Sequence, residues 1–162
     1  MLNKEDIINL LKEKKIPFEV VEHKAVFTVE EAEELKLPHP EAGAKNLFLR
    51  DDKKRNYYLI SCRDNLKVDI KNIQLKLNSR RLSFASEEDL MKIMGLIRGA
   101  VTPFGILNDE RRMVRMVFDD YFKDHLISVH PNDNKATLYI NGKDLYDVLN
   151  EHGNEIIYLN ME

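Results

Sequence analysis

Short hydrophobic runs separated by polar turns constrain the fold of this chain more than any other sequence feature. Two of these runs, 46–49 and 57–60, flank the polar turn 51–55 and predict a β-hairpin. Further strand-like runs are found at 18–21, 82–84, 114–118, 126–129, 137–140 and 156–159. No uninterrupted apolar run is longer than four residues, so we expect no membrane-spanning helix and no membrane partner.

Segments with helical spacing lie between these strands. Asn3 is the expected N-cap of a first helix, which the step into Pro17 ends. Further helices are predicted over 28–35, 69–77, 86–95 and 143–152. Helices and strands do not alternate regularly, and hairpins pair antiparallel. The pattern therefore predicts an α+β fold with one mixed, mostly antiparallel sheet of six or seven strands surrounded by helices.

The composition narrows the class of protein. A chain of 162 residues without repeats or linkers is expected to form a single domain over 1–162. The formal net charge of −3 excludes a globally basic nucleic-acid binder, although it allows a local basic face. The charged N-terminal segment does not resemble a signal peptide, and the single cysteine, Cys62, cannot form an internal disulfide. We therefore expect a cytoplasmic protein.

The candidate chemical groups are few. Free cysteines are usually buried hydrophobes, so a nucleophilic Cys62 is the minor alternative. The five histidines lack metal-ligand spacing, which predicts no metal site. The doublets Asp51-Asp52 and Asp119-Asp120 resemble turn residues. The glycine-containing stretch 95–105 looks too broken for a helix or strand, and it lacks the ending of a phosphate-binding P-loop. It is either a plain connector or a loop whose N–H groups approach an anion or oxyanion.

Four blocks of sequence carry a resemblance to a known family. In order, they are GAKNLFLR at 43–50, RLSFAS at 81–86, GAVTPFG at 99–105 and HPNDNKAT at 130–137. Together they resemble the YbaK/prolyl-tRNA-synthetase-associated editing domain family, and most closely its freestanding alanyl-tRNA(Pro) deacylase branch. The likeness spans nearly the whole chain.

The resemblance implies an editing domain that hydrolyses the ester joining a wrongly attached alanine to proline tRNA, with no metal or other cofactor. The implied catalytic residues are Lys45, which holds the tRNA 3′ end and the ester, and Asn46 and His130, which position the aminoacyl group and terminal adenosine. The implied substrate-binding residues are Gly99, Ala100, Val101, Thr102, Pro103, Phe104, Gly105, Asn134 and Thr137. In this family the vicinal ribose hydroxyl is thought to assist the attacking water, so no protein nucleophile is needed.

This chemistry agrees with the residues themselves. An aminoacyl ester is already activated, so a positioned water and a stabilised oxyanion suffice for hydrolysis. Lys45 offers a positive charge, and His130 either shuttles a proton or only orients the substrate. A pocket built for proline cannot firmly exclude alanine, because missing methylenes are worth only about 1–3 kcal/mol. A second, smaller site completes the discrimination, and Val101 and Phe104 are candidates for setting its size limit.

Basic residues suggest where the nucleic acid binds. Arg98 stands where relatives usually carry proline, and it could contact acceptor-stem phosphates together with Arg80, Arg81 and the turn 53–55. Solvated surface arginines are the alternative. The expected partner is the acceptor end of tRNA(Pro) carrying alanine. Binding to prolyl-tRNA synthetase, and the choice between monomer and homodimer, stay open at this point.

Three other functions remain as alternatives. The first is a deacylase for another mischarged tRNA, carrying cysteine, serine or threonine. The second is a non-catalytic module that binds tRNA or a synthetase, and the third is a small-molecule hydrolase that uses Cys62.

Overall fold

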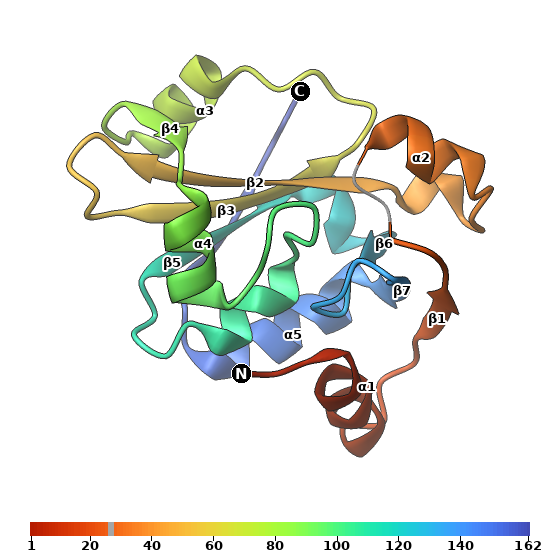
Figure 1. The fold of residues 1–162 in the computed structure, drawn as a ribbon. Helices are drawn as coiled ribbons and strands as arrows, with labels where there is room; N and C mark the ends of the chain where they lie inside the picture. The colour runs from red at the N-terminus through yellow and green to blue at the C-terminus, as the bar shows by residue number, and fades with distance from the viewer. Residues whose placement is uncertain (26–27) are drawn as a thin grey trace.

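The computed structural model describes residues 1–25 and 28–162 of the chain (Figure 1). Its strands are β1 (Glu19–Glu22), β2 (Ala44–Asp51), β3 (Tyr57–Arg63), β4 (Leu82–Phe84), β5 (Val114–Asp119), β6 (Leu126–Val129), β7 (Ala136–Asn141) and β8 (Ile156–Leu159). Its α-helices are α1 (Lys4–Glu13), α2 (Val29–Glu34), α3 (Ile70–Leu77), α4 (Glu87–Met94) and α5 (Gly142–His152). Three short 3₁₀ helices are η1 (Pro40–Ala42), η2 (Pro103–Asn108) and η3 (Asp120–Lys123).

The α+β class and the mostly antiparallel pairing are confirmed, but the strands do not form one sheet. The described residues contain eight strands in two sheets, ordered β4-β2-β3-β5-β8 and β1-β7-β6. The smaller sheet is wholly antiparallel, whereas β5 runs parallel to both β3 and β8 in the larger one. The prediction of one sheet of six or seven strands was wrong because hydrophobic alternation shows which face a strand buries, and not which neighbour it pairs with.

Capping side chains set the helix boundaries as the sequence predicted. Asn3 accepts a hydrogen bond from the N–H of Asp6 (2.9 Å), and Ser86 accepts one from the N–H of Asp89 (3.0 Å). One local prediction was wrong, because the last three residues of the stretch 95–105, together with 106–108, form η2. Thr102 caps η2 and Pro103 occupies its first turn, where a missing N–H costs no hydrogen bond.

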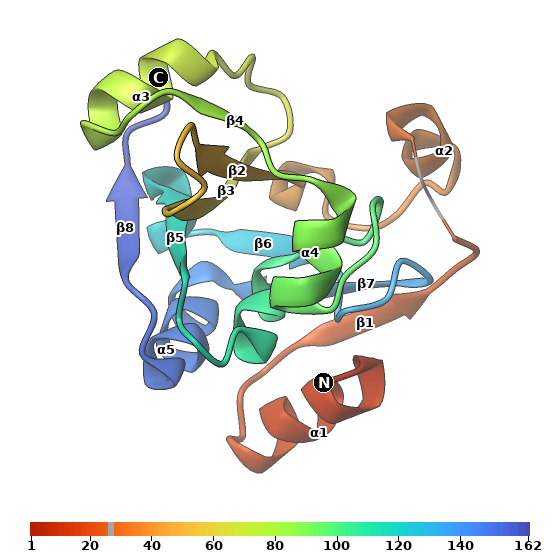
Figure 2. The same cartoon turned by 60° about the vertical axis from the view of Figure 1, so that its left-hand side comes forward.

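The hydrophobic core occupies both faces of the larger sheet (Figure 2). On one face, Leu59 packs in a cluster that also contains residues of the smaller sheet, α1, α4, α5 and η2. On the other face, Ile60 packs against Ile73 of α3. In Figure 1, α3 and α5 accordingly lie on opposite sides of this sheet. Within the described ranges, no helix is both long and apolar enough to span a bilayer.

A buried aspartate joins the β2–β3 hairpin to the end of β5. The carboxylate of Asp119 is fully buried, and its Oδ2 lies 2.8 Å from Nε of Arg63 and accepts the backbone N–H of the same residue at 3.0 Å. Its Oδ1 accepts the N–H of Tyr121 at 3.1 Å, which makes it the N-cap of η3. Asp119 is therefore both the last residue of β5 and the cap of the turn that follows it.

We expect Asp119→Ala to lower the free energy of unfolding by about 3 kcal/mol, because Arg63 loses the partner of its partly buried charge. Urea denaturation of the wild type and the variant measures the difference. The matched control is Glu155→Ala, at the exposed pair Arg115–Glu155 (2.9 Å), where we expect less than about 1 kcal/mol. Equal losses in the two variants would contradict the role of the buried carboxylate.

Candidate active site

A cleft of about 1320 Å³ brings most of the predicted chemical groups together. Its lining includes residues of α2 and η1 and residues of α4 and of the loop that follows α4. Figure 2 shows where α2 and α4 lie in the fold. The start of β2, the end of β6 and β7 also contribute to its wall. The predicted residues that line it are Lys45, Asn46, Arg98, Gly99, Val101, His130 and Thr137.

The pairing of β2 exposes the start of this strand to the cleft. β3 pairs with β2 from Ala44 to Arg50, whereas β4 pairs with β2 only from Leu49 to Asp51. Within residues 1–25 and 28–162, one edge of 44–47 therefore has no strand neighbour. Because side chains alternate along a strand, Lys45 and Asn46 point to opposite faces of the sheet at this open edge.

The ammonium group of Lys45 has a partner inside the protein. Its Nζ donates to the carbonyl of Leu66, in the segment that follows β3. Asp64 lies in the same segment, and its N–H donates to the carbonyl of Gly43 (3.1 Å). A Cβ on Gly43 would lie 2.0 Å from a carboxylate oxygen of Asp64, so a larger residue at position 43 would force this side chain, which lines the cleft, to move.

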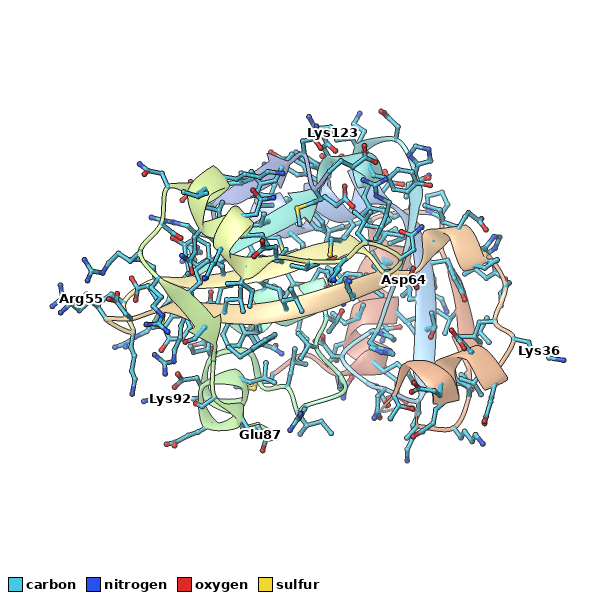
Figure 3. All side chains as sticks on the ribbon, turned by 90° about the horizontal axis from the view of Figure 1, so that it is seen from above. Lys36, Arg55, Asp64, Glu87, Lys92 and Lys123 are labelled. Carbon is cyan, nitrogen blue, oxygen red and sulfur yellow. The ribbon has the colours of Figure 1, made fainter. Side chains whose placement is uncertain are left out.

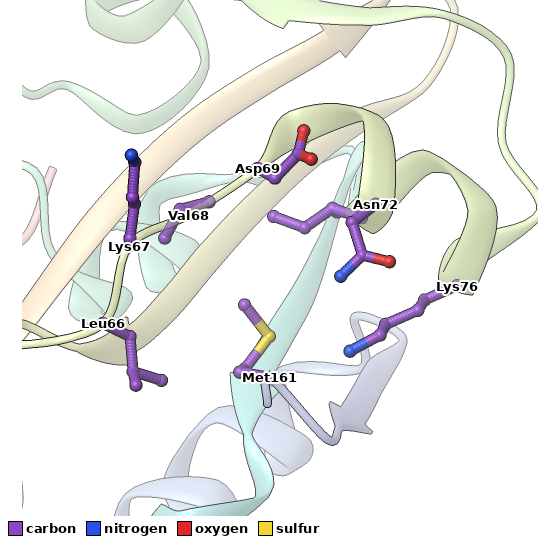
Figure 4. A pocket seen from close by; sticks show the side chains of 8 residues that line it. Leu66, Lys67, Val68, Asp69, Asn72, Lys76 and Met161 are labelled. Carbon is purple, nitrogen blue, oxygen red and sulfur yellow. The ribbon is translucent and has the colours of Figure 1, made fainter.

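A second cavity lies beside Leu66, away from the predicted site (Figure 4). Its volume is only about 40 Å³, and its lining includes Val68, Asn72 and Met161. A space of this size has room for only a few water molecules.

The side chain of Asn46 carries an acceptor without a partner. Its amide oxygen is buried, and no hydrogen-bond donor reaches it in the part of the chain that the structure describes. Buried polar atoms are nearly always hydrogen-bonded, so an orphaned acceptor on a cleft wall is suited to a donor from a ligand.

His130 is held in one tautomer. Its Nδ1 lies 3.0 Å from the carbonyl of Ala136, which can only accept, so Nδ1 carries the proton and Nε2 keeps a lone pair. Burial lowers the pKa of His130 below its usual value, so the imidazole is neutral at pH 7. The hydroxyl of Thr102 donates to the backbone carbonyl of His130, which ties the loop to the end of β6.

Thr137 lies beside a histidine that the sequence analysis missed. Nε2 of His23 is 2.8 Å from the Thr137 hydroxyl, and its Nδ1 is 2.7 Å from the carbonyl of Lys24. No motif surrounds His23, and only the pairing of β1 with β7 brings it here, so no local signal could have identified it.

Two aromatic residues of the cleft were also missed. The rings of His39 and Tyr139 meet edge to face, with centroids 5.0 Å apart, and Nε2 of His39 is 2.9 Å from a carboxylate oxygen of Glu19. Burial raises the pKa of Tyr139 to about 12, so its hydroxyl stays protonated at neutral pH.

Several predicted substrate-binding residues lie behind the wall of the cleft. Only Gly99 and Val101 of the 99–105 block line it. The remainder of the block is buried, namely Ala100, Thr102, Pro103, Phe104 and Gly105. Phe104 belongs to the core because η2 turns its side chain inward, which leaves Val101 as the loop residue that can limit the size of a ligand. Asn134 is buried and is not among the lining residues.

The predicted cationic residues are not gathered in one place. Arg80 forms a two-point contact with the carboxylate of Asp52, at 2.6 and 2.9 Å, and neither Arg80 nor Arg81 lines the cleft. In Figure 3, Arg55 lies at the opposite end of the β2–β3 hairpin from Asp64, so the basic turn is remote from the site. Arg98 lies at the cleft with 86% of its side chain exposed, 3.6 Å from Glu87.

The environment of Cys62 does not suit a nucleophile. The side chain of Cys62 is fully buried, at the position of β3 that pairs with Lys45 of β2. Burial raises the pKa of the Cys62 thiol to about 11. No group of three His, Cys, Asp or Glu side chains placed to hold a metal ion is found among the described residues.

We expect native Cys62 to resist a thiol reagent such as DTNB at pH 8, because a pKa of about 11 leaves only about one thiol in a thousand ionised. Absorbance of the released thiolate measures the reaction, and the same protein in denaturant serves as the control with full labelling. Rapid labelling of the native protein would restore the alternative of a cysteine-dependent hydrolase.

Known proteins resemble this chain over nearly its full length. The family profile described as "Aminoacyl-tRNA editing domain" matches residues 23–148. The sequence is 43% identical over 152 residues to the prolyl-tRNA editing protein ProX of Acetoanaerobium sticklandii, a match that covers 93% of each chain. It is 32% identical to the prolyl-tRNA synthetase associated domain-containing protein 1 of Mus musculus, over 89% of this chain and 88% of the other.

A solved structure has the same fold. It is described as a proposed trans-editing enzyme for prolyl tRNA synthetase, and it superposes with a TM-score of 0.69 over 96% of each chain. With 18% sequence identity, this likeness concerns the fold alone.

Proposed function

Because this chain belongs to the aminoacyl-tRNA editing domain family, we propose that it is a trans-editing hydrolase that deacylates mischarged Ala-tRNA(Pro). Water cleaves the aminoacyl ester and releases alanine and tRNA(Pro). The observation that carries the proposal is the meeting of Lys45, Asn46 and His130 at one cleft. The proposed substrate is the acceptor end of tRNA(Pro), and the name of the ProX relative, a prolyl-tRNA editing protein, supports a tRNA substrate.

Each of these three residues has a distinct task in the proposed reaction. The ammonium group of Lys45 releases its hydrogen bond to the carbonyl of Leu66 and binds the ester instead. There it stabilises the oxyanion of the tetrahedral intermediate. The orphaned oxygen of Asn46 accepts a hydrogen bond from the α-ammonium group of alanine. The neutral His130, with its lone pair on Nε2, orders the water or the terminal ribose.

The glycine loop supplies backbone donors and the size limit. The N–H of Ala100 is already bonded to the carbonyl of Ile97 (3.1 Å), so it cannot serve an oxyanion. This leaves the neighbouring N–H groups of Gly99 and Val101 as the candidates. The side chain of Val101 limits the depth available to the amino acid, which favours alanine over the larger proline ring.

The whole chain works as one editing domain of 1–162 in this proposal, in the cytoplasm where aminoacyl-tRNA is made. The family match leaves α1 outside its limits, yet Ile7 and Leu11 of α1 are fully buried in the main core, which supports a single unit. Among the basic residues, Arg98 is the candidate for a phosphate contact, because it is exposed at the cleft.

A deacylation assay with purified protein tests the substrate. We expect Ala-tRNA(Pro) to be hydrolysed fastest, Cys-tRNA(Pro) more slowly, and Pro-tRNA(Pro) at the spontaneous rate, because only the smallest side chain clears Val101. Fastest turnover of the cysteinyl ester would assign the chain to a different substrate. No acceleration of any ester would favour the non-catalytic module.

The same assay tests Lys45. Lys45→Ala should lower kcat for Ala-tRNA(Pro) about 100-fold or more, as loss of an oxyanion donor does. Lys143→Ala, at an exposed lysine of α5, is the matched control and should retain the wild-type rate. Unchanged hydrolysis by the Lys45 variant would remove this residue from the mechanism.

The pH dependence of hydrolysis tests the neutral form of His130. Because burial lowers the pKa of His130, the neutral imidazole persists further into acid than an exposed histidine would. We expect enzymatic kcat/KM, corrected for spontaneous hydrolysis, to be constant near pH 7 and to fall in acid with a midpoint below about 6.5. A midpoint at pH 7 or above would contradict the assignment.

A further inference from the structure

Among the phenylalanines that the structure describes, one is far more exposed than the rest. Phe84 is 59% exposed at the end of β4, whereas Phe48, Phe104, Phe118 and Phe122 are at most 5% exposed. An aromatic side chain that stays largely exposed does not gain the stabilisation that burial provides. Phe84 also lies on the wall of the same cleft as Lys45, so its exposed surface faces a site and not only open solvent.

Strand register places this ring relative to the reacting ester. Phe84 pairs with Leu49, and side chains at paired positions share a face of the sheet. Lys45 lies on that same face, because it is four residues from Leu49 along β2. The separation along the strand is about 13 Å, at about 3.3 Å per residue. The hydrogen bond from Ala85 N–H to the carbonyl of Phe48 (2.9 Å) fixes the chain directly after Phe84.

The charges near Phe84 disfavour a phosphate as its ligand. The first turn of α4, which begins three residues later, carries Glu87, Glu88 and Asp89. Its carboxylates repel a phosphate, and the exposed Arg98 lies 3.6 Å from one of them, that of Glu87. An uncharged, flat group is a better match for an exposed ring beside acidic residues.

We propose that Phe84 is a stacking platform for a nucleobase of the tRNA 3′ end, bound while the ester lies at Lys45. This inference rests on the proposed function, which supplies the polynucleotide. Every base has an aromatic face, and aromatic side chains bind single-stranded ends by stacking without regard to sequence. The last two nucleotides can span the distance between Lys45 and Phe84, so the base belongs to one of them.

A fluorescence titration tests the contact directly. The chain contains no tryptophan, so Phe84→Trp introduces a single indole at the proposed platform. We expect uncharged tRNA(Pro) with an intact 3′ end to quench its emission, and tRNA(Pro) lacking the last two nucleotides to leave it unchanged. Leu75→Trp is the matched control, since Leu75 is 80% exposed on α3 and outside the cleft lining. Equal quenching by the intact and truncated tRNAs, or none by either, overturns the proposal.

Kinetics distinguish stacking from a simple apolar contact. Phe84→Ala should raise KM for Ala-tRNA(Pro) about tenfold and leave kcat within about twofold, since the lost contact is remote from the ester. Phe84→Tyr keeps an aromatic ring and should have a KM close to the wild-type value, whereas Phe84→Leu should have a raised KM like the alanine variant. A wild-type KM in the leucine variant, or an unchanged KM in the alanine variant, overturns the proposal. Absence of hydrolysis by the wild type refutes the proposed function instead, and the fluorescence titration still decides on stacking.

Discussion

The unequal pairing of β2 decides where a ligand can reach the larger sheet. β3 covers one edge of β2 along almost its whole length, whereas β4 covers only the last three residues of the other edge. β4 ends there because Ser86 caps α4 and the chain leaves the sheet. Four further residues of pairing in the same register would cover the edge at both Asn46 and Lys45. A single capping hydroxyl therefore helps to define both the start of a helix and the mouth of the cleft.

A second hydroxyl holds the opposite wall in place. Thr102 caps η2 and donates to the carbonyl of His130, so the loop and the end of β6 are joined through one side chain. Phe104, fully buried behind the loop, anchors it from the core. Arg98 lies before these anchors, and most of its side chain is exposed. The rigidity of the Val101 segment therefore depends on Thr102 and η2 more than on the residue at position 98.

The sequence predicted the features that depend on neighbouring residues. The caps at Asn3 and Ser86 are confirmed because each is a contact over three positions. The resemblance to the editing family is confirmed for the same reason, since its four blocks are local motifs. Local patterns also predicted the strand at 46–49, next to Lys45, but they could not show that β4 stops short of this lysine.

The remaining features depend on contacts between distant segments. His23 reaches Thr137 only through the pairing of β1 with β7, 114 positions apart. Arg80 is neutralised by Asp52 across 28 positions, so a residue that looks like a free cation in the sequence already has a partner. Phe104 is buried in the core and does not line the cleft, and the residues next to it in the block did not predict this burial.

The distribution of charge suggests how such an enzyme avoids retaining its product. Charged and uncharged tRNA carry the same phosphates, so phosphate contacts bind both equally and do not accelerate hydrolysis. In this chain, with a net charge of −3, Arg80 is paired with Asp52 and Arg98 lies near Glu87. Electrostatic attraction to the tRNA backbone is correspondingly weak. In the proposed reaction, the contacts at Lys45 and Asn46 act on the ester and the amino acid, which are the parts lost on hydrolysis. Binding free energy concentrated there distinguishes substrate from product and allows the deacylated tRNA to leave.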